Sequence, residues 1–170
     1  MCRPAGGGLP RTPGIVDTDL NIQSVDMALF QRVAKHLPSD NDLTLITLKG
    51  HLLVEEILDS IIAKHCKDES ALEGVDFRFQ LKARLAAALT GQPELAPAWV
   101  MIDKLNALRN ALAHKIEHPL AQRRLEVFLE LFRHTEIKLP ASSDNADKLR
   151  NSIAFLIGFV VGATQDKHID

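Results

Sequence analysis

The chain has 170 residues, a formal net charge of -2 and 46% hydrophobic residues, which together indicate one soluble globular domain. The slightly negative balance argues against broad, unspecific binding to nucleic acid, which needs a basic surface, although a specific nucleic-acid substrate stays open. Cys2 and Cys66 are the only cysteines, so we expect no disulfide framework and a reducing, cytoplasmic environment.

The first segment, MCRPAGGGLPRTPG, is dominated by glycine and proline and lacks the apolar core of a secretory signal. Such a composition buries too little apolar surface to order itself. We therefore expect a flexible N-terminal tail over residues 1–22 and a single helical domain over residues 23–166.

The domain is expected to contain about six helices, because apolar residues recur at helical spacing and no strand-like alternation lasts long enough to indicate a sheet. Pro38, Gly91 and Pro119 mark the ends of three of them. In chain order the expected helices cover residues 25–37, 43–66, 77–89, 99–118, 120–135 and 146–163. The fold class is all-α, a bundle in which the second and fourth helices form a long antiparallel central pair.

The second helix has a clear start and one unusual interior residue. Asp42 is placed to cap its first turn. Gly50 in its interior costs about 1 kcal/mol relative to alanine, which indicates a position where a neighbouring helix approaches closely. The expected buried stripe comprises Leu45, Leu48, Leu52, Leu53, Ile57, Ile61 and Ile62.

The last helix contains the most apolar run of the chain, Ile153–Ala163. This run is far shorter than the roughly 20 residues needed to cross a bilayer, so a buried helix and no membrane contact are expected. Gly158 and Gly162 within it have the G-x-x-x-G spacing, which in a soluble helix is typical of close helix packing and in a membrane marks a dimerisation face.

The fourth helix, WVMIDKLNALRNALAHKIEH, carries two different stripes. The first is apolar and is expected to face the core; it comprises Met101, Leu105, Leu108 and Leu112. The second is polar and mostly uncharged; it comprises Asp103, Asn106, Asn110 and His114. A solvated face would carry Lys and Glu, whereas asparagine and histidine among small alanines favour close approach and hydrogen bonding.

The sharpest local pattern lies near the end of this helix, where Arg109 is followed directly by Asn110 and then, after three more residues, by His114. This arrangement resembles the Arg-x4–6-His motif of the HEPN superfamily, helical bundles of which many are metal-independent endoribonucleases and toxins. The segments GHLLVEEILDSII and FRFQLKARLAAALTG also resemble the earlier helices of this group, so the resemblance covers about residues 43–135.

The resemblance implies a role for each motif residue: His114 as the acid/base, Arg109 as the phosphate clamp and Asn110 as a polar positioning residue. These residue types suit the chemistry. Histidine, with an unperturbed pKa of about 6.5, can take the proton of the 2′-OH. A guanidinium can bind the oxygens of the pentavalent phosphate through paired, charge-assisted hydrogen bonds. Neither a metal nor another cofactor is implied.

Helical geometry limits how the motif can work, because Arg109 and His114 diverge by about 140° on an ideal helix. A long arginine side chain, or unwinding before Pro119, would narrow this gap. Two copies of the helix that pool their residues across a two-fold axis would also solve it. The family resemblance implies this second solution, a composite site in a homodimer, with Asn106, Asn110 and His114 facing the second copy.

Two interpretations of the motif stay open. Arg-x4-His alone is a weak signal, and a structural cluster that caps helices or fills a dimer seam would look the same. The mannitol-operon repressor-like proteins have a similar helical layout, so the runner-up is a non-catalytic transcriptional regulator or interaction module. The ribonuclease reading implies RNA as substrate and, for a toxin or defence effector, an antitoxin partner. Antitoxin control through a tyrosine two residues after the histidine is excluded, because that position is Ile116 and the chain has no tyrosine.

Other polar residues give weaker signals. His51 and Glu55, at i and i+4, are expected to be a solvated surface pair. His114 and His118 share a zinc-binding spacing but lack an evident third ligand. Cys66 is expected to be a small buried or half-buried thiol. Four basic residues are expected to form a solvated face, with attraction of RNA as the alternative: Lys104, Lys115, Arg123 and Arg124.

Overall fold

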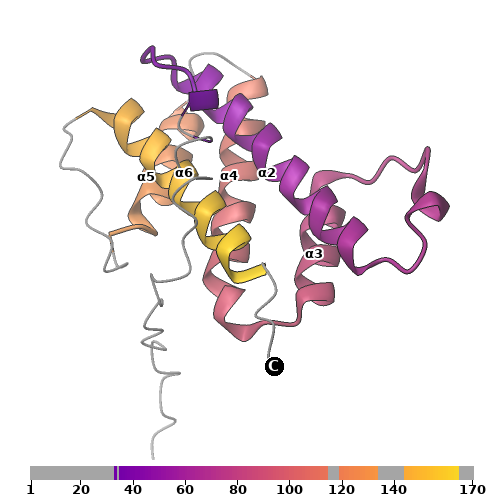
Figure 1. Ribbon diagram of the computed structural model, residues 1–170. Helices are drawn as coiled ribbons and strands as arrows, with labels where there is room; N and C mark the ends of the chain where they lie inside the picture. The colour runs from indigo at the N-terminus through magenta and orange to yellow at the C-terminus, as the bar shows by residue number, and fades with distance from the viewer. Residues whose placement is uncertain (1–32, 34, 115–118, 134–143, 165–170) are drawn as a thin grey trace, which may run out of the picture.

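The computed structural model describes residues 33, 35–114, 119–133 and 144–164, with His114 described by its backbone alone (Figure 1). This part of the chain is helical and contains no strand, which confirms the all-α prediction. Its α-helices are α2 (Leu43–His65), α3 (Phe79–Thr90), α4 (Ala96–His114), α5 (Pro119–Glu130) and α6 (Asn145–Thr164). Two short 3-10 helices, η2 (Glu69–Leu72) and η3 (Pro93–Leu95), lie in the connections. The predicted tail and most of the predicted first helix lie outside the described residues.

The helix ends follow the predicted local signals. The Asp42 carboxylate accepts hydrogen bonds from the backbone N–H groups of Thr44 and Leu45, at 2.9 Å and 3.1 Å, and so caps the start of α2. Gly91 ends α3 with a φ of 57°, the left-handed conformation that favours glycine. The start of α4 at Ala96 lies before the predicted start at residue 99, and Pro97 lies in its first turn, where the missing N–H costs no hydrogen bond.

The most enclosed helix is α6, which packs against α2, α4 and α5. Every residue from Ser152 to Val160 is buried, including the apolar side chains on all sides of the helix. A helix that is apolar all round has to lie inside the bundle, and Figure 1 shows α6 between α5 and α2. The predicted buried helix is confirmed, whereas the long antiparallel central pair of α2 and α4 stays a prediction.

The contact between α2 and α6 depends on Gly50. A Cβ atom at this position would lie 2.6 Å from Cδ1 and 2.9 Å from Cγ2 of Ile153, closer than side-chain atoms can pack. The glycine therefore allows the close approach that the sequence indicated. The predicted stripe of α2 is partly wrong: Ile61 and Ile62 are buried, but Leu52 is 58% exposed. The buried face is rotated from the predicted one and comprises Ile46, Thr47, Gly50, His51, Val54, Leu58, Ile61 and Ile62.

Arg150 ties the start of α6 to the turn that precedes α2. Its guanidinium donates to the backbone oxygens of Pro38, Ser39 and Asp40 at 2.7 Å, 3.1 Å and 2.6 Å. It also donates to the side chains of Asn41, at 3.0 Å, and Asp147. With its donors used in this way, Arg150 is a structural residue that joins the two helices.

None of the helices in the described part of the chain is long and apolar enough to cross a membrane.

The apolar stripe of α4 is confirmed, since Met101, Leu105 and Leu108 are buried and Leu112 packs against the core. On α5, Leu125 and Phe128 are also buried.

Candidate functional site

The polar stripe of α4 lies only partly on the surface, because Asp103 and Asn110 are exposed whereas Asn106 is buried. Asn106 is only 6% exposed, and its Oδ1 lies 3.1 Å from Nε2 of His51 on α2, which is equally buried. Two predictions are therefore corrected. His51 does not form a solvated surface pair with Glu55, and Asn106 does not face a second copy, because its amide oxygen already bonds within the same chain. The sequence separation of 55 residues explains why local patterns did not reveal this pair.

The third element at this site is α3, whose first residue, Phe79, stacks on the imidazole of His51. The two ring centroids are 3.9 Å apart and the ring planes are inclined by 28°. Stacking at this distance holds the imidazole in one orientation while Nε2 bonds with Asn106. His51 is thus fixed between α3 and α4, although it belongs to α2.

The environment of His51 lowers the pKa of its imidazole below the ordinary value of 6.5. Burial is the main cause, because it disfavours the charged ring, and the hydrogen bond with Asn106 opposes it. The positive charge of Arg109 lowers the pKa further, while Glu55 raises it. At neutral pH the ring is therefore uncharged. Because an amide oxygen only accepts, Nε2–H of His51 is the donor in this bond.

Arg109 and Asn110 follow one turn later on the same side of α4. Nη1 of Arg109 donates to Oδ1 of Asn110 at 3.2 Å. Arg109 is half-buried and Asn110 is exposed. Among the residues that the structure describes, no carboxylate forms an ion pair with Arg109. The guanidinium therefore has donors left for an anion, and its charge is close enough to act on His51.

His114 is the last residue of α4, and its side chain is not described. The structure thus brings together two of the three predicted site residues, Arg109 and Asn110, and leaves the position of the His114 imidazole as a prediction. Lys115, Ile116 and His118 lie outside the described residues, so the zinc spacing of His114 and His118 stays untested as well.

Sequence reasoning missed His51, although one signal pointed to it. Val54 and Leu58 follow His51 at i+3 and i+7, so all three share one face of α2, and both apolar residues are buried. Reading the stripe from these residues, instead of from Leu52, places His51 in the interior. A buried histidine needs a polar partner, and α4 offers asparagines.

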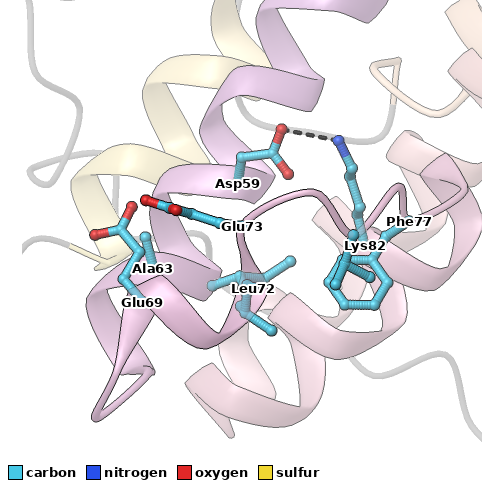
Figure 2. Close-up of a pocket in the computed structure, with 9 residues that line it drawn as sticks. Asp59, Ala63, Glu69, Leu72, Glu73, Phe77 and Lys82 are labelled. Carbon is cyan, nitrogen blue, oxygen red and sulfur yellow. Dashed lines mark hydrogen bonds and ion pairs between the residues drawn. The ribbon is translucent and has the colours of Figure 1, made fainter.

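A second feature is a pocket of about 270 Å³ at the far end of α2, shown in Figure 2. Its apolar lining includes Ile62, Leu72, Val75 and Phe77. Its carboxylates are those of Asp59, Glu69 and Glu73. Figure 2 shows Lys82 reaching from α3 to Asp59, with Nζ 2.8 Å from that carboxylate. Carboxylates repel phosphate, so this pocket does not suit the backbone of RNA.

Lys82 also pairs with Glu55, at 3.0 Å, and its side chain is only 13% exposed. Burial by itself lowers the pKa of Lys82, but the hydrogen bonds to Asp59 and Glu55 outweigh this effect and leave the pKa raised. Lys82 is therefore a charged structural residue, and the pocket has no imidazole, thiol or hydroxyl nucleophile among its lining residues.

The remaining candidates have ordinary surroundings. Cys66 is a half-buried free thiol, as predicted. Lys104 and Arg124 are half-buried and Arg123 is exposed. Within the described residues no group of three or more His, Cys, Asp or Glu side chains is arranged to hold a metal ion.

No protein-family model matches the chain, and comparisons with curated proteins and with solved structures found no match. The geometry of the site therefore carries the functional argument.

Proposed function

We propose that the protein is a metal-independent endoribonuclease of HEPN type, acting as a homodimer in the cytoplasm as a toxin or defence effector. RNA is the substrate, and an antitoxin or regulatory protein is the expected partner. Each of the two composite sites combines residues from both copies of α4, in a bundle of about six helices with a long antiparallel central pair.

The observation that carries the proposal is the state of Arg109. Among the described residues, the guanidinium of the half-buried Arg109 bonds only to the neighbouring Asn110 amide and gains no counter-ion. A phosphate supplies this counter-ion, and charge-assisted hydrogen bonds to its oxygens are stronger than those to a neutral amide. Arg109 is thus suited to clamp the scissile phosphate, with Asn110 beside it as the positioning residue.

His114 supplies the proton transfer in this proposal. Its backbone is one turn beyond Asn110, at i+4, so the two share a side of α4 at the end of the helix. Arg109 points to a different side, by about 140° on an ideal helix, which is the reason for a second copy. With Asn106 bonded to His51, the seam between copies is formed by Asn110, His114 and the alanines of the last turn.

The decisive experiment is cleavage of a fluorescently labelled RNA by the purified protein in EDTA. The expected product carries a 2′,3′-cyclic phosphate. Arg109→Ala and His114→Ala are each expected to lower the rate by about 100-fold or more. Arg84→Ala is the matched control, because it removes an exposed arginine from α3 and leaves the site intact. Cleavage by the Arg109→Ala/His114→Ala variant at the wild-type rate would overturn the site assignment.

The dimer is tested separately with Asn110→Arg. This change places like charges near the proposed two-fold axis, so the protein should shift toward the monomer in light scattering. Mixing Arg109→Ala with His114→Ala protein should regenerate one intact composite site per mixed dimer and restore part of the cleavage. A wild-type monomer at micromolar concentration, or a mixture without activity, contradicts the composite site.

The alternative is a non-catalytic regulator or interaction module, similar to the mannitol-operon repressor-like proteins. The pocket between α2 and the start of α3 favours it, because this pocket offers apolar and acidic contacts without catalytic groups. Under this alternative the site variants leave cells unaffected, whereas Glu73→Lys disturbs a partner contact. The neighbouring gene is a further indication: a small antitoxin-like reading frame favours the ribonuclease, and a sugar-transport operon favours the regulator.

A further inference from the structure

His51 and Asn106 form a polar contact in the protein interior, where two apolar side chains would fill the same space equally well. Burying an imidazole and an amide is costly unless they bond to each other, and replacing both by apolar groups of similar shape is often nearly neutral. Stability alone therefore does not explain the pair. What a polar pair adds is register, because only one rotation of α4 against α2 brings Nε2 within 3.1 Å of Oδ1.

That register extends to the proposed site. Asn106, Arg109 and Asn110 stand at i, i+3 and i+4 on α4 and share one side of the helix. A rotation of α4 that broke the bond at Asn106 would also turn Arg109 away from its present position. Phe79 on α3 completes the anchor by holding the imidazole from the other side.

We propose that His51 is a positioning residue of the Arg109 site, which it sets through its buried hydrogen bond with Asn106. This inference rests on the proposed function for its substrate class, RNA. His51 does not touch the substrate; it acts through Asn106 on the two residues that do.

The charges around His51 predict a second observable effect, a change in the pKa of its imidazole when a phosphate binds at Arg109. The positive charge of Arg109 acts on the ring from α4 and the negative charge of Glu55 acts from its own helix, while α3 contributes the aromatic ring of Phe79 and Lys82, which pairs with Glu55. Protonation of the ring would place a second cation beside Arg109. A phosphate bound at Arg109 offsets that repulsion, so by linkage it should raise the pKa of the His51 imidazole.

The test uses an uncleavable 2′-O-methyl oligoribonucleotide as the probe and the full chain as the protein. His51→Gln keeps a side-chain N–H donor for Asn106 and should hold the affinity within about twofold. His51→Phe keeps a ring against Phe79 but leaves the Asn106 oxygen without its donor, and should weaken binding about tenfold, the equivalent of one lost hydrogen bond. His65→Phe, at an exposed position, is the control.

A double variant, His51→Leu/Asn106→Leu, separates positioning from folding. Replacing both partners should leave thermal unfolding close to that of the wild type and still weaken binding about tenfold, because the register is lost. In the wild type, NMR of the His51 ring should show its pKa rising when the oligonucleotide binds, and Arg109→Gln should abolish that rise.

The outcomes are distinguishable. If the wild type binds the oligonucleotide with this pattern of variants but does not cut RNA in EDTA, the ribonuclease proposal fails and the role of His51 stands. If His51→Phe and the double variant bind as tightly as the wild type, the role of His51 fails whether or not the protein cuts RNA. An oligonucleotide that binds none of the proteins overturns the inference as well.

Discussion

Two arginines of this protein lie in contrasting regions. Arg150, at the start of α6, donates to the backbone of the turn before α2 and to neighbouring side chains, and only 17% of its side chain is exposed. Arg109, near the end of α4, is also half-buried, but within the part of the chain that the structure describes it bonds only to the adjacent Asn110 amide. The first region uses its donors within the fold, whereas the second has donors that no described residue accepts, as the proposed phosphate site requires. The hydrogen-bond partners of an arginine, more than its burial, therefore separate a structural residue from a candidate binding residue.

The largest difference between the two arginines is expected in stability when each is removed in turn. Arg150→Ala should lower the free energy of unfolding by about 2–3 kcal/mol, since several hydrogen bonds from a charged group are lost. Arg109→Ala should change it by less than about 0.5 kcal/mol. Urea denaturation followed by circular dichroism measures both.

The control for this pair is Arg133→Ala, which removes an exposed ion pair with Glu130 and should cost no more than about 0.5 kcal/mol. Equal losses for Arg109→Ala and Arg150→Ala would show that the two arginines play the same structural role, and the comparison would fail.

A smaller effect is expected where α2 meets α6. Gly50→Ala should destabilise the protein by about 1 kcal/mol, since overpacking against Ile153 costs about 1–3 kcal/mol and better helix propensity returns up to about 1 kcal/mol. Adding Ile153→Val removes the nearer methyl group and should relieve part of the loss. A double-mutant cycle without coupling would show that the two residues do not constrain each other.

The smallest effect is the pH dependence of the buried pair. Because the pKa of His51 is lower in the folded state than its ordinary value of 6.5, the unfolded state binds more protons just below that pH. Stability from this group is complete above pH 6.5 and declines as the pH falls toward the folded pKa. His51→Gln should lack this part of the decline, which unfolding curves at successive pH values can reveal. A wild type and variant with parallel curves would contradict the buried, neutral imidazole.

The local features of the fold were predictable from the sequence. Asp42, Gly91 and Pro97 act on the residues next to them, so their signals survive without knowledge of the tertiary structure. The apolar run of α6 also predicted its burial, because a helix that is apolar on all sides is unstable in contact with water. For α2, the periodicity of the leucines was ambiguous. Leu52 fitted an apolar helical stripe, but the face that is buried in the structure is the one that carries His51.

The site was predictable only in its local part. Arg109 and Asn110 are neighbours in the chain, and the bond between their side chains needs no long-range information. The bond between His51 and Asn106 depends on how α2 and α4 cross, and the stacking of Phe79 depends on where α3 begins. These contacts are set by packing across the bundle, which the spacing of residues in one helix does not encode.

In the proposed function, Arg109 is held ready for a phosphate. The most direct measurement is the salt dependence of the affinity for the 2′-O-methyl oligoribonucleotide in the wild type and in Arg109→Ala. If Arg109 neutralises one phosphate of a single strand, the slope of log K against log salt should become shallower by about 0.7, and the affinity should fall. Arg84→Ala should leave both unchanged. An Arg109→Ala protein with the wild-type slope and affinity would contradict the claim.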